Sequence, residues 1–157
     1  MPEPAHVLVV AHQTASTSGL MDAVRARSER GPATFHLVVP QRPHGMHKYV
    51  DPHDDGVEEA QAVLTNALPK LSAAAGAEVT GRTGDPEPLM AIHDAVNLGH
   101  YDEIIISTLP RRVSKWLHLD LVSKARGLGL PVTHVEAQHA PDDGRARQPE
   151  AASTGGR

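Results

Sequence analysis

The amino-acid sequence predicts an α/β fold: a five-stranded parallel sheet in the strand order 3-2-1-4-5, with helices on both faces. Short apolar segments alternate along the chain with segments of helical periodicity, which is typical of a doubly wound sheet. The run Ile104–Ile106 is apolar at every position, as in a strand that is buried on both faces. Right-handed crossovers between such units favour the stated strand order.

The first half of the chain begins with two buried strands. Val7–Ala11 is the first, and the hydroxyl-rich turn that follows it supplies caps for a helix ending near Gly31. Phe35–Val39 is the second strand. Residues 41–55 are polar and lack periodicity, so we expect a long loop there.

A long helix is expected next, from Asp54 or Asp55 to Gly76, because apolar residues recur at helical spacing. Pro69 lies inside this helix and should kink it or split it in two, since proline removes a backbone hydrogen bond. Residues 77–83 form a weaker, more polar strand that suits an edge of the sheet.

The remaining elements follow the same alternation. Asp85–Glu87 begins a helix, because it combines a cap with a proline in the first turn. The strand around Ile104 comes next, and one helix is expected from about Ser114 to Leu128. Pro131–Val135 is the last strand, and its leading proline favours an edge position.

Length and composition indicate one soluble domain. The chain has 157 residues, enough for a single domain with its own core. Residues 139–157 have no apolar period, so we expect a domain over 1–138 and a disordered tail.

The absence of cysteine excludes disulfides and thiol catalysis. The apolar run near the start is too short for a signal peptide or a membrane span, so a cytoplasmic protein without a membrane partner is expected.

Charge and aromatic content argue against a nucleic-acid partner. The formal net charge is −4, and only one Trp, two Tyr and one Phe are present, which leaves few rings to stack on bases or a flavin. Polar residues that could bind a metal gather in the predicted loop: His44, His47, His53, Asp51, Asp54 and Asp55. Their spacing matches no short metal motif, so we expect a hydrated loop and no metal site.

The turn after the Ile104 strand is the candidate binding site. In parallel sheets ligands bind beyond the carboxyl ends of strands, and arginine forks and hydroxyls match phosphate or carboxylate. The candidate ligand-binding or anion-binding residues are His12, Thr14, Val39, Ser107, Thr108, Arg111, Arg112, Ser114 and Lys115. A small anion or a monophosphate suits these few donors better than a triphosphate. The alternative is a solvated basic turn in which Ser114 is an ordinary helix cap.

Four local motifs and the order of the elements resemble the universal stress protein family over about residues 5–137. The motifs are Val7–Val10, Gly84–Ile92, Asp102–Ser107 and Leu130–Val135. The resemblance implies a Rossmann-like fold of the adenine nucleotide alpha hydrolase-like type. It also implies frequent homodimers and roles in the stress response, and many members bind ATP or another adenine nucleotide.

The family's ATP pattern is Gly-x-x-Gly, about nine residues, then Gly-Ser or Gly-Thr. In this chain Ser107 and Pro110 stand at the first two glycines, and Asp120 stands at the third. His12 replaces the acid that usually ends the first strand. Glycine lets backbone N–H groups approach phosphate, whereas proline has no N–H and an aspartate would repel phosphate. We therefore expect no ATP binding of the usual family kind, and the ligand expected is another adenine nucleotide or a small anion.

The combined prediction is a binding or regulatory homodimer in the stress response, with no catalytic residue assigned. Dimerisation is expected through the last strand, because a short apolar edge strand leaves backbone groups free to pair. The residues concerned are Val132, Thr133, His134 and Val135. Two alternatives are a carrier or enzyme that uses a phosphorylated cofactor such as FMN, and a dimerisation module without a ligand.

Overall fold

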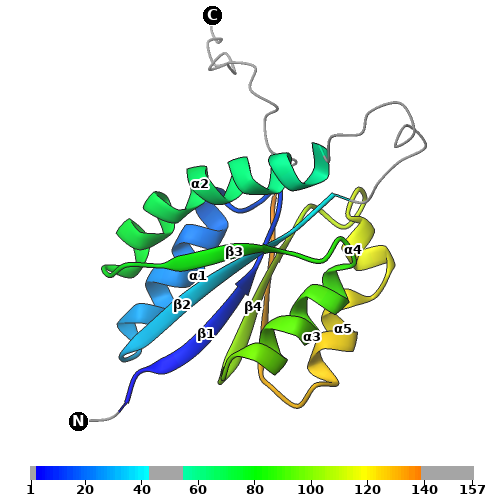
Figure 1. The fold of residues 1–157 in the computed structure, drawn as a ribbon. Coiled ribbons are helices and arrows are strands. Elements are labelled where there is room, and N and C mark those ends of the chain that lie inside the picture. Colours follow the sequence, from blue (N-terminus) through cyan, green and yellow to red (C-terminus); the bar gives the residue numbers. More distant parts are fainter. Residues whose placement is uncertain (1–2, 43–54, 139–157) are drawn as a thin grey trace, which may run out of the picture.

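The computed structural model describes residues 3–42 and 55–138 and contains one five-stranded parallel sheet. The elements are β1 (Ala5–Val10), α1 (Ser18–Glu29), β2 (Ala33–Pro40), α2 (Asp55–Ala75), β3 (Thr80–Gly84), α3 (Pro88–Leu98), β4 (Glu103–Thr108), α4 (Lys115–His118), α5 (Leu121–Arg126) and β5 (Val132–Glu136). The strand order is β3-β2-β1-β4-β5, which confirms the predicted topology (Figure 1). The expected tail and most of the His-rich loop lie outside the described residues.

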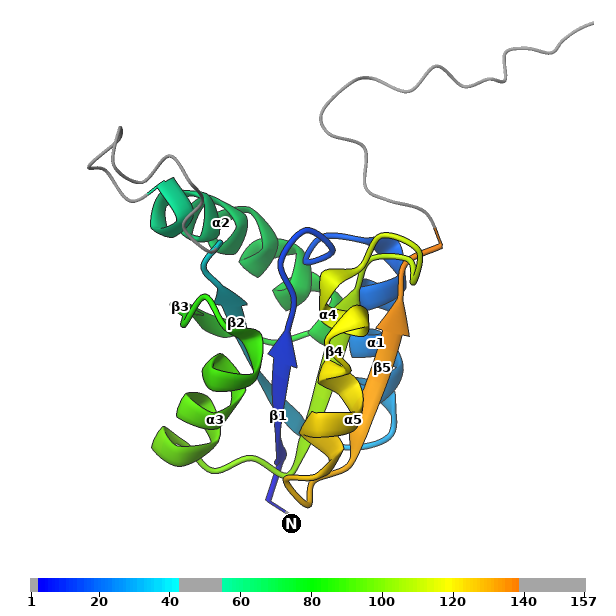
Figure 2. The ribbon, with the colours of Figure 1, turned by 90° about the vertical axis from the view of Figure 1, so that its right-hand side faces the viewer.

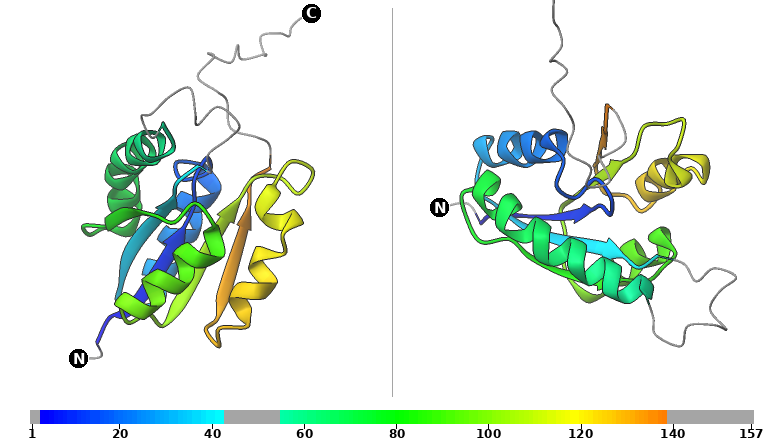
Figure 3. Two further views of the ribbon diagram at one scale, coloured as in Figure 1. Left: turned by 45° about the vertical axis from the view of Figure 1, so that its right-hand side comes forward. Right: turned by 90° about the horizontal axis from the view of Figure 1, so that it is seen from above.

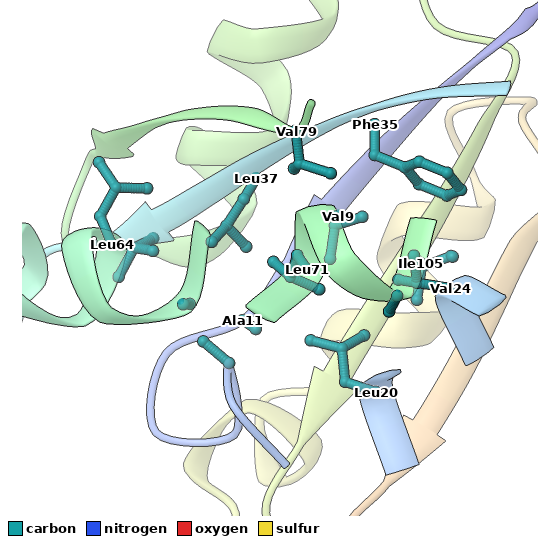
Figure 4. Close-up of a cluster of buried hydrophobic side chains, with 14 of the residues drawn as sticks. Val9, Ala11, Leu20, Val24, Phe35, Leu37, Leu64, Leu71, Val79 and Ile105 are labelled. Atoms are coloured by element: carbon teal, nitrogen blue, oxygen red, sulfur yellow. The ribbon is translucent and has the colours of Figure 1, made fainter. Parts of the chain in front are cut away.

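Helices cover both faces of the sheet. Helices α1 and α2 lie on one face, and α3, α4 and α5 lie on the other (Figures 2 and 3). Side chains of β1 alternate between the two layers, since Val9 belongs to the core under α1 and α2 whereas Leu8 and Val10 belong to the core under α3 and α5. Figure 4 shows the first of these cores. Residues Ile104–Ile106 of β4 are at most 2% exposed, so this strand is buried on both faces as predicted.

Helix α2 is continuous through Pro69, so of the two expected effects of this proline, a kink or a split, the split does not occur. Pro69 itself is exposed, and the flanking Ala67 and Leu71 are fully buried against the sheet. Proline lacks the N–H that would bond within the helix, but burial of the neighbouring apolar side chains favours one continuous helix.

The single helix expected from Ser114 to Leu128 is in fact two helices, α4 and α5. The break falls at Asp120, whose backbone adopts the left-handed conformation with φ 61° and ψ 38°. Aspartate is one of the few residues besides glycine that tolerate this region. The apolar spacing of Leu117, Leu121 and Ala125 continues across the break, which is why periodicity alone did not reveal it.

Candidate functional site

The candidate site lies where the chain leaves the sheet toward opposite faces. Strands β1 and β4 are hydrogen-bonded neighbours, and β1 leads to α1 on one face whereas β4 leads to α4 on the other (Figure 2). In open parallel sheets this switch point is the usual ligand position. His12 and Thr14 follow β1, and Ser107 and Thr108 end β4, so the structure brings these four residues to the same end of neighbouring strands.

Two buried hydroxyl groups are hydrogen-bonded to each other at the switch point. Thr14 Oγ1 and Ser107 Oγ are 2.6 Å apart, and both residues are 1% exposed. The distance is typical of a short O–H···O hydrogen bond, in which either hydroxyl can donate. The bond ties the turn after β1 to the end of β4, across 93 residues of sequence. Ser107 is the residue that stands at the first glycine of the family's ATP pattern.

The two other predicted hydroxyls are engaged with different partners. Thr108 Oγ1 lies 2.8 Å from Nε2 of His134 on β5. Ser114 is 2% exposed, and its Oγ accepts a hydrogen bond from the backbone N–H of Leu117 at 3.1 Å. Ser114 therefore acts as the N-cap of α4. Both hydroxyls therefore bond to groups of the protein, as expected if the turn is a solvated basic turn in which Ser114 caps the helix.

The cations of the turn point outward. Arg111, Arg112 and Lys115 are exposed, and none of the three forms an ion pair with another described residue. The backbone N–H of Arg111 donates to a carboxylate oxygen of Glu136 at 2.6 Å, which fixes the turn against the end of β5. The cations are thus available to an anion in solvent, although an acidic group already occupies one side of the turn.

His12 and Val39 occupy contrasting environments at this end of the sheet. Val39 is fully buried in the core under α2, so its side chain packs and does not face solvent. His12 is partly buried, and its Nε2 is inaccessible and has no hydrogen-bond partner among the described residues. Burial lowers the pKa of His12; Glu59 raises it and Arg42 lowers it, with smaller effects. The ring is therefore uncharged at neutral pH.

A second concave region was not predicted from the sequence. A groove of about 470 Å³ lies between the ends of β2 and β3 and helix α3. Its lining residues are Val38, Gln41, Arg82, Thr83, Gly84, Asp85, Ala91, Asp94, Asn97 and Leu98. Gly84, Asp85 and Ala91 belong to the motif Gly84–Ile92, but neither that motif nor the polar character of the predicted edge strand indicated a groove. The groove does not include the residues of the switch point.

Neither a helix able to cross a membrane nor a cluster of metal-ligating side chains occurs among the described residues. No helix within residues 3–42 and 55–138 combines the length and apolar character needed to cross a membrane. Across the same ranges, no three His, Asp or Glu side chains are grouped in a way that could hold a metal ion.

Comparison with known proteins identifies similar folds but no close relative. No family model matches the sequence, and no curated protein matches it. A protein from the universal stress protein family of Burkholderia pseudomallei superposes with a TM-score of 0.60 at 15% identity, over 85% of this chain and 96% of that one. The universal stress protein from Archaeoglobus fulgidus gives 0.59 at 18% identity, over 83% and 93%.

A structure of the universal stress protein from Archaeoglobus fulgidus in complex with dAMP also matches, with a TM-score of 0.54 at 18% identity. The match covers 86% of this chain and 99% of that one. At these identities the likeness concerns the fold. It agrees with the resemblance inferred from the sequence motifs, and this chain therefore has the fold of the universal stress proteins.

Proposed function

We propose that this chain is a universal stress protein-like binding and regulatory protein, that it works as a homodimer, and that it does not bind ATP in the usual family manner. The fold supports the first part of the proposal. The observation that carries the last part is the buried hydrogen bond between Thr14 and Ser107, at the place where the family pattern has a glycine.

Few backbone donors remain for a triphosphate at the end of β4. Pro110 has no N–H, and the N–H of Leu117 is already bonded to Ser114. Helix α4 has only 4 residues, about one turn, so its dipole is small. Asp120 keeps a left-handed backbone but adds a carboxylate that repels phosphate.

A ligand with less charge suits the same turn better. The exposed cations Arg111, Arg112 and Lys115 can hold a monophosphate or another small anion by charge and hydrogen bonds. One similar structure holds dAMP, an adenine nucleoside monophosphate. We therefore favour a nucleoside monophosphate or a small anion as the ligand in this region.

The edge strand β5 supports the homodimer. It pairs with β4 on one side only, and Val132 and Val135 remain partly exposed on it. An uncovered edge with apolar side chains favours pairing with a second copy. Light scattering of the purified protein should give a mass near twice the 16.8 kDa of one chain. A mass of one chain at high micromolar concentration would contradict the dimer.

Calorimetric titration tests the nucleotide part. Magnesium-ATP should bind the full chain no more tightly than about 100 µM, equivalent to about −5.5 kcal/mol. A variant with all three glycines restored (Ser107→Gly, Pro110→Gly and Asp120→Gly) should bind ATP at least about tenfold more tightly, provided that its circular dichroism matches the parent. A stoichiometric low-micromolar ATP site in the parent would contradict the proposal. The same conclusion would follow if the restored variant bound no better.

A further inference from the structure

The groove beside β3 exists because α3 leaves the edge of the sheet uncovered. The residues of β3 that face α3 are Thr80, Arg82 and Gly84, which pair with the α3-facing residues of β2. At Gly84 the helix is in close contact, since an added Cβ would lie 3.0 Å from the Cβ of Ala91. Two residues earlier, Arg82 is exposed. The groove lies along β3 between Gly84 and Arg82, and none of the switch-point residues lines it.

Opposite charges line the groove without pairing. Arg82 lies on the strand wall, whereas Asp94 lies on the helix wall. The side-chain nitrogens of Arg82 all lie more than 4.0 Å, the limit for an ion pair, from the carboxylate oxygens of the described residues. This holds for Asp85 and Asp94 as well, although both line the same groove. The side chains of Asp94 and Asn97 are exposed, and neither makes a hydrogen bond with another described residue. Each wall therefore keeps an unused charged or amide group.

The base of the groove is apolar. Val38 is 1% exposed and Ala91 is 2% exposed, and both line the groove. Leu98 also lines it and is 73% exposed, an unusual exposure for leucine. The volume of about 470 Å³ lies within the range of about 300–1,000 Å³ typical of small-molecule sites.

From this arrangement we infer that the groove binds a small zwitterion, an aliphatic α-amino acid, with its carboxylate on Arg82, its ammonium group on Asp94 and its side chain against Val38 and Leu98. A dianion such as phosphate is disfavoured by the two aspartates, and a simple amine is disfavoured by the arginine. Only a ligand that carries both charges satisfies both walls. The guanidinium fork matches a carboxylate in two hydrogen bonds.

The neighbours of Arg82 support a carboxylate at that position. Burial raises the pKa of Tyr101 and lowers that of His36, and the charge of Arg82 lowers both pKa values by a smaller amount. Both rings are therefore neutral at pH 7 and do not compete with Arg82 for an anion.

Nuclear magnetic resonance of the ¹⁵N-labelled full chain provides the test. L-leucine at about 10 mM should shift the amide signals of Arg82 and Asp94, as expected for a Kd of about 1 mM or below. 4-Methylpentanoate is L-leucine without the ammonium group, and isoamylamine is L-leucine without the carboxylate. Each should bind at least about tenfold more weakly than L-leucine.

Variants separate the two charges. Arg82→Gln and Asp94→Asn should each weaken L-leucine binding at least about tenfold, while Lys70→Gln, at an exposed cation of α2 outside both sites, should leave it unchanged. Matching circular dichroism and urea midpoints verify that each variant is folded. The inference is overturned by an absence of shifts at the groove with L-leucine, by equal binding of 4-methylpentanoate, or by an unchanged affinity in either groove variant. These outcomes are independent of ATP binding and of the oligomeric state.

Discussion

The hydrogen bond between Thr14 and Ser107 can be measured by a double-mutant cycle. Thr14→Val and Ser107→Ala each remove one hydroxyl with little change of shape. Both residues are 1% exposed, so a single substitution leaves the other hydroxyl buried without a partner. Such an orphaned group costs about 1–3 kcal/mol of the free energy of unfolding. Each single variant should be destabilised by that amount.

The double variant should lose less than the sum of the two single losses. Removing both hydroxyls leaves no unsatisfied group, so the coupling free energy should be about 1–2 kcal/mol. Urea unfolding followed by circular dichroism provides the four free energies, with unchanged slopes as the condition for comparing them. The matched control is Thr34→Val, whose exposed hydroxyl bonds to His6 at 2.9 Å and should change stability by less than about 0.5 kcal/mol. Additive losses at Thr14 and Ser107 would refute the buried pair.

Two further predictions concern pH and an ion pair. Burial lowers the pKa of three histidines in the folded state: His12, His36 and His134. The unfolded chain then binds more protons as pH falls through about 6.5, so stability should decrease from pH 7 toward pH 5. A urea midpoint that is constant or higher at pH 5 would count against this. Arg27 and Glu103 form an ion pair at 2.9 Å with side chains only 13% and 18% exposed. Arg27→Ala should therefore lower the free energy of unfolding by about 1–2 kcal/mol. The control is Arg25→Ala, which removes an exposed ion pair with Asp22 and should lower it by less than about 0.5 kcal/mol. Equal losses in the two variants would contradict the role of burial.

Features that depend on local pattern could be predicted from the sequence. The run Ile104–Ile106 identified β4 as a strand buried on both faces. Asp85–Glu87 located the start of α3 to within a few residues, although the N-cap is Glu87 and the proline of the first turn is Pro88. These signals lie in adjacent residues. Their physical cause, burial on two faces or an unsatisfied backbone N–H, acts over one turn or one strand.

Features that depend on distant residues could not be predicted. Thr14 and Ser107 are 93 positions apart, and no pattern in the sequence indicates that their hydroxyls form a hydrogen bond. The groove combines Arg82 on an edge strand with Asp94 on a helix, and both residues read in isolation as ordinary solvated charges. The break between α4 and α5 at Asp120 was also not predicted, because the apolar residues on either side of it keep the spacing of one continuous helix.

The backbone at Asp120 has an evolutionary consequence. The loop already adopts a left-handed conformation there, at the position where the ATP-binding pattern has a glycine. A change to glycine would therefore need no rearrangement of the chain, and it would remove both a side-chain penalty and a negative charge. Aspartate and glycine codons differ by a single nucleotide. One point mutation at this position would thus supply the glycine of the pattern, and selection could gain or lose that glycine without first reshaping the main chain.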